Sequence, residues 1–200
     1  MSTALLTSPP VRIRVAQSAP RLLTAADLIA MPTSLPSGDV RYELDDGALV
    51  IMAPAAFIHA EHQSKVHATL LIHAQMTGLG NAYVEVPIVL RRNPDRVVAA
   101  DGAFLTVDQL PVKRSKEGYL ETIPKLVVEV KSKNDTWPEI ESKAAEYLAA
   151  GVELVWVLDD TKNAITAYPL GQSPKIFAAT DLLTAPFLLG FSVPVADFFA

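Results

Sequence analysis

The stretch "PKLVVEVKSK", residues 124–133, decides the fold because an apolar run passes into charged residues without a turn. Leu126, Val127 and Val128 have the composition of a buried strand. A strand alternates its faces with a period of two, so Glu129 and Lys131 project to one side and Val130 to the other. The sequence therefore predicts a carboxylate and an ammonium on one small patch at the end of a buried strand.

Turn and cap signals divide the first half of the chain into elements. In "TAADLIAMP", Thr24 is a plausible N-cap of a short helix that Pro32 ends. "YELDDGALVIM" reads as two strands around a turn at Asp46-Gly47, which is common hairpin chemistry. Residues 59–77 are expected to form a helix with one apolar stripe, followed by the strands "AYVEVPIVLR" and "RVVAADGAFLTV".

The second half continues with a helix and further strands. "NDTWPEIESKAAEYLAAG" is expected to be helical, with Asp135 or Thr136 as the cap, Pro138 in the first turn and Gly151 at the end. "VELVWVLDD" and "AITAYPL" look like strands joined through "TKN". This order predicts an α+β or mixed α/β fold, a mixed sheet covered by helices, in a single domain over residues 21–200.

Composition limits the function classes. The 200 residues suffice for one core, and the absence of cysteine excludes disulfides, thiolate zinc sites and a cysteine nucleophile. Residues 1–20, with three prolines, read as a flexible arm. The opening residues make a poor signal peptide and no segment is long enough to span a bilayer, so we expect a cytoplasmic protein without membrane contact. The net charge of −5 argues mildly against a protein that coats nucleic acid.

Asp101, an acid within an apolar strand region, is the first partner for Glu129. Carboxylate oxygens are the ligands that Mg²⁺ and Mn²⁺ prefer, and the carbonyl of Val130 offers a further oxygen. Lys131 would stand beside such a cation, where it helps to deprotonate a water or stabilises charge on phosphorus. The alternative is that Asp101-Gly102 only turns a hairpin.

Six basic residues crowd the segment around Asp101, and they allow two interpretations. They form a basic rim for nucleic acid, or they are solvated charges on loops and strand ends. The six are Arg91, Arg92, Arg96, Lys113, Arg114 and Lys116.

The order of several motifs resembles the Uma2 family of restriction-endonuclease-type proteins, within the PD-(D/E)XK nuclease superfamily. They are "YELDDG", a helix with His62, Asp101 on a strand, "PKLVVEVKS", "ESKAAEYLAAGVELVWVLD" and the ending "FLLGFSVPVADFF". The resemblance covers residues 21–200. It implies that Asp101 and Glu129 bind a divalent metal and that Lys131 assists the attacking water. It also implies that Glu43 and His62 contribute near the metal.

Each of these secondary residues has a structural alternative. Glu43 is equally explained as a charge on an edge strand, and His62 as a partly buried structural histidine. Lys143 forms either an ordinary surface pair with Glu139 or a supporting contact to phosphate or carboxylate. The spacing of His59 and His62 lacks a third ligand motif, which argues against zinc.

The sequence thus predicts an Mg²⁺- or Mn²⁺-dependent DNA endonuclease that uses a metal-activated water. A homodimer is possible, since nucleases that cut both strands commonly work as dimers. Two other functions stay open: a catalytically inactive nuclease-fold protein that binds nucleic acid or protein, and a hydrolase of smaller phosphate esters.

Overall fold

The computed structural model describes residues 21–36, 38–52, 56–133 and 135–200, so the arm predicted over residues 1–20 lies outside the described residues. The helices are α1 (Ala25–Ile29), α2 (Phe57–Thr77) and α3 (Trp137–Ala150), with short 3-10 turns at Val107–Gln109 and Val195–Phe198. The strands are β1 (Ser34–Leu35), β2 (Gly38–Asp39), β3 (Arg41–Asp45), β4 (Ala48–Met52), β5 (Gly80–Arg91), β6 (Arg96–Thr106), β7 (Leu126–Val130), β8 (Leu154–Asp159), β9 (Ala164–Pro169), β10 (Lys175–Phe177), β11 (Leu182–Leu183) and β12 (Val193–Pro194). No described helix has the length and apolar character needed to cross a bilayer.

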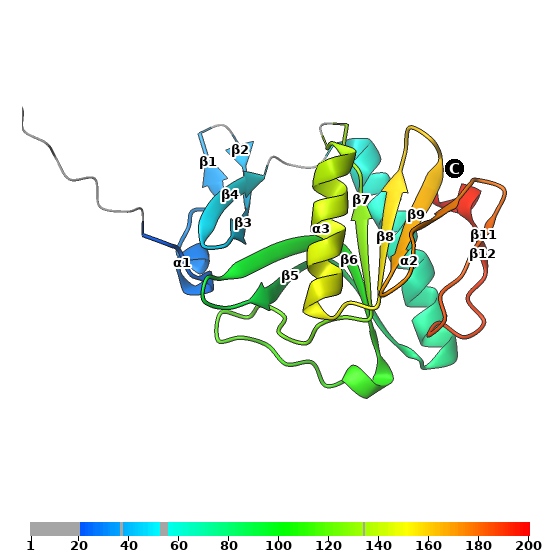
Figure 1. The fold of residues 1–200 in the computed structure, drawn as a ribbon, viewed down its shortest axis with the longest axis horizontal. Coiled ribbons are helices and arrows are strands. Elements are labelled where there is room, and N and C mark those ends of the chain that lie inside the picture. Colours follow the sequence, from blue (N-terminus) through cyan, green and yellow to red (C-terminus); the bar gives the residue numbers. More distant parts are fainter. Residues whose placement is uncertain (1–20, 37, 53–55, 134) are drawn as a thin grey trace, which may run out of the picture.

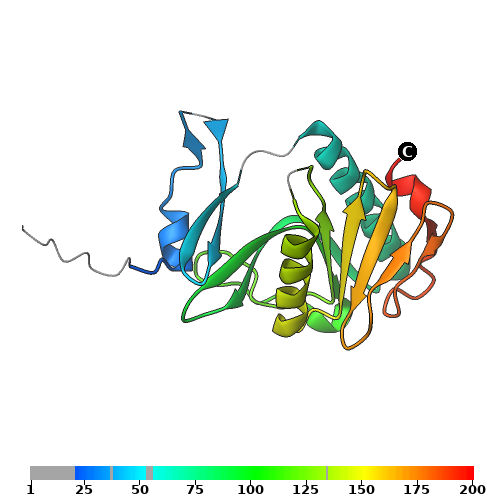
Figure 2. The ribbon, with the colours of Figure 1, turned by 45° about the horizontal axis from the view of Figure 1, so that its top comes forward.

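One mixed sheet organises the chain. Its strands follow the order β10-β9-β8-β7-β6-β3-β4, and β5 pairs with β6 outside this path. All neighbours are antiparallel except β7 and β8, which α3 connects as a crossover helix. Figures 1 and 2 show α3 across one face of the sheet and α2 across the other. This is the helix-covered mixed sheet that the sequence predicts.

The alternation of β7 divides the core between these two faces. Leu126, Val128 and Val130 pack in the cluster that contains the stripe of α2, whereas Val127 packs in the cluster that contains Tyr147 of α3. Strand β8 is buried along its whole length because it is covered on both faces. The odd-numbered positions of β7 therefore face α3, and Glu129 is one of them.

The sheet branches at β6. Strand β5 pairs with β6 along almost its whole length and occupies one edge. The other edge is shared: β3 pairs there through Leu44 and Val97, and β7 pairs from Gly102 to Phe104. Between these contacts, residues 98–101 of β6 have no strand partner on this edge among the described residues. The branch opens a gap in the middle of the sheet.

Local signals in the sequence correspond to observed boundaries. Thr24 and Thr136 each close a capping box at the start of a helix, and Gly151 ends α3 in a left-handed conformation with φ of 106°. Asp46 and Gly47 have φ of 49° and 78°, as a tight turn between β3 and β4 requires. Asp101 lies inside β6, not at a turn, so the hairpin alternative for Asp101-Gly102 is wrong.

Two strand glycines should differ in their tolerance of a methyl group. A Cβ at Gly80 would collide with the carbonyl oxygen of Leu105, whereas a Cβ at Gly102 would be 3.4 Å from Val128 Cβ. We expect Gly80→Ala to lower the free energy of unfolding by about 1 to 3 kcal/mol. Gly102→Ala should change it by less than about 1 kcal/mol. Urea unfolding of both variants measures this, and equal losses would contradict the packing described for the two strands.

Candidate active site

Two carboxylates occupy the branch point of the sheet. Glu43 Oε1 accepts a hydrogen bond of 3.0 Å from the backbone N–H of Ala99, and Asp101 Oδ2 accepts one of 2.8 Å from the N–H of Val130. Strand pairing would otherwise be needed for these N–H groups, because buried backbone donors need acceptors. Glu43 and Asp101 thus replace sheet pairing where β3 and β7 separate from β6.

The backbone of β6 is irregular at Asp101. Ala100 and Ala103 both pack in the cluster on the α3 side, a step of three residues where a regular strand has a step of two. On the neighbouring strand β5, Glu85 has a positive φ of 51°. The alternation of side chains between the two faces of the sheet is therefore interrupted in both strands. In β6 the interruption lies at Asp101-Gly102.

Glu129 is held on the α3 side of the sheet by two side chains of that helix. Tyr147 donates its hydroxyl to Glu129 Oε1 at 2.5 Å, and Lys143 Nζ lies 3.2 Å from the same oxygen. Lys143 Nζ is also 3.3 Å from Glu43 Oε1. The ammonium of Lys143 therefore bridges carboxylates from two strands that do not pair with each other.

The electrostatics follow from this crowding of acids. Burial raises the pKa of Glu129 to about 7, with Asp101 and Glu43 adding to the rise while Lys143 opposes it. Burial alone would lower the pKa of Lys143, but the carboxylates of Glu129 and Glu43 raise it above its ordinary value. The site therefore holds the Lys143 cation beside Glu129, a carboxylate whose ionisation is disfavoured.

Lys131 lines one cavity together with Asp101 and Glu129, but its ammonium does not contact their carboxylates. Its ammonium donates to the carbonyl oxygen of Ser132 at 3.2 Å. Since Lys143 makes the contacts to Glu129, the lysine nearest the acids comes from α3 and not from the strand motif. Of the two interpretations of Lys143 in the sequence, the contact to carboxylate is the one observed.

The first turns of α2 contribute two residues that sequence reasoning missed. His59 Nε2 lies 3.0 Å from Asp101 Oδ1, and this hydrogen bond is the main cause that raises the pKa of His59. Gln63 donates its amide to the backbone oxygen of Asp101 at 3.0 Å. The spacing of four residues places both on one face of the helix, and this pattern was available in the sequence.

His62 also lines the cavity, but both of its ring nitrogens have structural partners. Nδ1 lies 3.0 Å from the carbonyl oxygen of Phe198, and Nε2 lies 2.9 Å from Asp160 Oδ1. The side chain is only 1% exposed. His62 therefore ties α2 to the C-terminal turn and to the turn between β8 and β9.

These residues surround a cavity of about 800 Å³. Acidic and basic side chains both line it, from β3, α2, β6, the end of β7 and α3. The charged and imidazole members are Arg41, His59, His62, Asp101, Glu129, Lys131, Lys133, Asp135, Glu139, Lys143 and Asp160. Within the described part of the chain, no group of three or more His, Asp or Glu side chains is already arranged around a point where a metal ion would bind.

The six basic residues around Asp101, which the sequence left as either a rim for nucleic acid or solvated charges, mostly contact acids of this protein. Arg96 is buried, and its guanidinium contacts Glu146 at 2.5 Å and Glu43 at 3.6 Å, so it supports the site from inside the protein. Other members of the six are held in surface ion pairs, namely Arg91 with Asp46, Arg92 with Asp95, Glu117 and Glu121, and Lys113 with Glu121. Most of the cluster is therefore neutralised by acids near it.

Stability should depend on pH through Glu129. Its pKa is about 7 in the folded protein and 4.5 as an ordinary side chain, so stability falls as pH rises between these values. Glu129→Gln has no carboxyl group to ionise, so this variant should lack that fall in the free energy of unfolding, which is on the order of 2 kcal/mol. The pKa of His59 is also raised, so its contribution to stability likewise falls as pH rises. His59 is present in both wild type and Glu129→Gln.

The measurement is urea unfolding at pH 5 and pH 8 with a chelator present. Glu153→Gln is the matched control, because Glu153 pairs with Lys125 at the opposite end of β7 and is 43% exposed. Curves for wild type and Glu129→Gln that run parallel across this range would contradict the prediction.

Comparison with known proteins identifies the family of this chain. Residues 26–196 match the Uma2 family, described as "Putative restriction endonuclease". No protein with a curated description matches. A crystal structure of "a putative nuclease belonging to DUF820" from Anabaena variabilis ATCC 29413 is similar in fold, with a TM-score of 0.71 at 16% identity over 88% of this chain and 97% of that one. The match over most of the chain shows that this protein belongs to the Uma2 family.

Proposed function

We propose that this protein is a divalent-metal-dependent endonuclease that hydrolyses phosphodiester bonds in DNA. The observation that carries the proposal is the meeting of Asp101 and Glu129 with Lys131 and Lys143 in one cavity at the branch of the sheet, with Glu43 paired to Lys143. Membership of a family described as restriction endonucleases supports the same reaction. Hydrolysis at phosphorus needs stabilisation of developing negative charge and an activated water, which such a site supplies.

The donor set fits Mg²⁺ or Mn²⁺. Asp101 and Glu129 present carboxylate oxygens to the cavity. Burial, with a smaller contribution from Asp101 and Glu43, raises the pKa of Glu129, and a hard cation beside it would favour the ionised carboxylate. Asp101, Glu129 and the carbonyl of Val130 would hold the ion. When bound, it supplies polarisation of a water molecule and stabilisation of charge at the phosphate.

The protein's own groups have separate tasks in this proposal. Lys143 and Tyr147 fix the carboxylate of Glu129, and Lys143 offsets repulsion between Glu129 and Glu43. His59 and the N–H of Val130 each engage one oxygen of Asp101 and so set its orientation. Lys131 keeps its ammonium away from the acids, on the cavity wall, where it is available to a scissile phosphate.

Plasmid nicking tests the function and separates the two lysines. Wild type should nick DNA with Mg²⁺ or Mn²⁺ and not in a chelator. Lys131→Ala should lower the rate by roughly 10²-fold to 10³-fold with an unchanged thermal midpoint. Glu129→Ala should cost at least as much. Lys143→Ala should lower both the rate and the stability, the latter by about 3 kcal/mol, because it leaves buried carboxylates without their cation.

Glu153→Gln serves as the control, since it removes a carboxylate from an ion pair far from the cavity. A wild-type protein that binds DNA and never cleaves it with any divalent metal would leave a binding module as the function. Cleavage of small phosphate esters but not of DNA would assign the third function considered from the sequence.

The salt dependence of DNA binding locates the contact surface. Lys133 is exposed and lines the cavity, whereas Lys113 is exposed but paired with Glu121. We expect Lys133→Gln to reduce the slope of log K against log salt by about 0.9, the contribution of one phosphate contact. Lys113→Gln should leave the slope close to that of wild type. Fluorescence anisotropy of labelled duplex DNA in chelator gives both slopes, and a reversed order would place the DNA on the other side of the protein.

A further inference from the structure

A second and smaller cavity lies away from the candidate active site. Its volume is about 210 Å³, enough for a single aromatic ring with a substituent. It is bounded by β5 and by the hairpin that follows residue 112. Its lining residues are Tyr83, Val86, Pro87, Val112, Arg114, Gly118 and Leu120.

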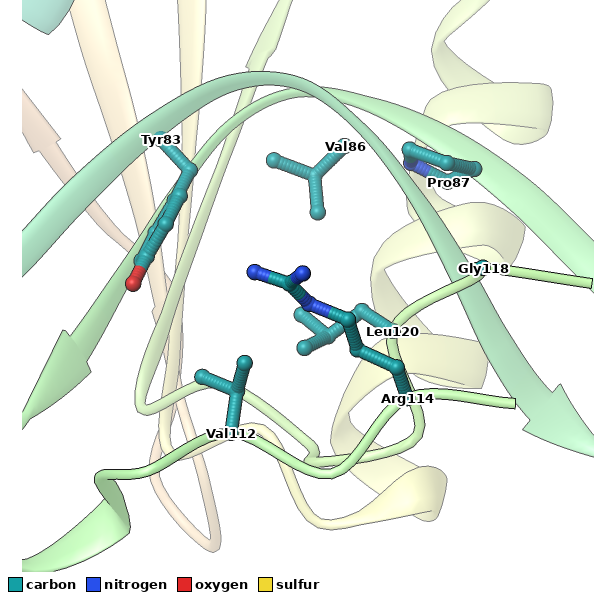
Figure 3. Close-up of a pocket in the computed structure, with 7 residues that line it drawn as sticks. All are labelled: Tyr83, Val86, Pro87, Val112, Arg114, Gly118 and Leu120. Atoms are coloured by element: carbon teal, nitrogen blue, oxygen red, sulfur yellow. The ribbon is translucent and has the colours of Figure 1, made fainter. Parts of the chain in front are cut away.

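The cavity has apolar walls, one aromatic side and one cation. Figure 3 shows the Arg114 guanidinium reaching into the hollow between Val86 and Val112, with the Tyr83 ring along one side. Val86 is only 7% exposed, so the floor is part of the core. None of the lining residues is acidic. The hollow therefore combines a surface for a flat ring with a single positive charge.

Arg114 differs from the other arginines of its segment in having no acidic partner. Within the described part of the chain, Arg91, Arg92 and Arg96 each contact a carboxylate, and Arg114 contacts none. Tyr83 and Arg114 both line the open volume of the cavity. A guanidinium over an apolar hollow is set to accept an anion in two parallel hydrogen bonds.

The hairpin that carries Arg114 is firmly braced. Leu120 donates to the carbonyl of Pro87 at 2.9 Å and accepts from Val89 N at 2.9 Å, which adds the hairpin to β5 as a short extra strand. Ser115 and Tyr119 close its turn with a backbone hydrogen bond of 2.8 Å. The backbone that carries Arg114 is thus held opposite β5, which lowers the cost of ordering the hairpin when a ligand binds.

We propose that this cavity, the Arg114 pocket, binds a nucleotide that carries a terminal phosphate. The base lies against Tyr83 and the apolar floor, and the phosphate pairs with Arg114. The choice of a nucleotide among planar anions rests on the proposed function, and the site would recognise either a free nucleotide or the phosphorylated end of a DNA strand.

Binding of short oligonucleotides in chelator tests the proposal without any cleavage. Wild type should bind 5′-phosphorylated single-stranded DNA about tenfold more tightly than the 5′-hydroxyl form. Arg114→Gln should remove this preference, and Tyr83→Leu should weaken binding of both forms. Lys116→Gln is the matched control, because it removes the same charge from the same hairpin at an exposed residue that does not line the pocket.

Thermal midpoints establish that each variant is folded. Val112→Phe, which fills the pocket, should remove the preference for 5′-phosphorylated DNA as Arg114→Gln does. Competition by dTMP that depends on Arg114 assigns the pocket to free nucleotides, whereas a phosphate preference for the oligonucleotide alone assigns it to strand ends. Equal affinity for the two oligonucleotides without competition by dTMP would overturn the proposal, as would equal losses in Arg114→Gln and Lys116→Gln. Failure to cleave DNA would overturn the nuclease function and leave this result unaffected.

Discussion

The unpaired edge of β6 is the constraint on which the site depends. Strands β3 and β7 share that edge and separate from it over residues 98–101, which leaves backbone N–H groups in the interior of the sheet without strand acceptors. A buried donor without a partner costs about 1 to 3 kcal/mol. Glu43 and Asp101 supply the acceptors for Ala99 and Val130. Two acids that serve chemistry in the proposed function therefore also complete the hydrogen bonding of the fold.

The same branch brings several carboxylates together, and helix α3 supplies a compensating cation, Lys143. Glu129 points from β7 toward this helix, where Lys143 contacts both Glu129 and Glu43, and the buried Arg96 also contacts Glu43. Burial nevertheless raises the pKa of Glu129, with Asp101 and Glu43 adding to the rise. A carboxylate whose ionisation is disfavoured by burial has an electrostatic reason to accept a cation beside it, which links the packing of α3 to the proposed metal dependence.

Each of the two helices that cover the sheet contacts one of the two carboxylates, Asp101 or Glu129. The start of α2 brings His59 and Gln63 to Asp101, while His62 on the same turn ties the helix to Phe198 and Asp160. Helix α3 brings Lys143 and Tyr147 to Glu129. Because each carboxylate is positioned by a different helix, a small shift of either helix against the sheet would change the distance between the two acids.

The sequence by itself determined the longer helices and strands and the face on which Glu129 lies, but not the short strands β1, β2, β10, β11 and β12. Strand alternation, the turn at Asp46-Gly47 and the caps at Thr24 and Thr136 depend on neighbours within a few residues, so local rules suffice for them. The tertiary structure alone decided which cations meet the acids. Lys143 rather than Lys131 reaches Glu129, and Arg96 lies inside the protein, because these contacts depend on how β3 and β7 share an edge and on where α3 crosses the sheet. Pairing between residues 52 or 100 positions apart is set by packing of the whole sheet, which no local pattern records.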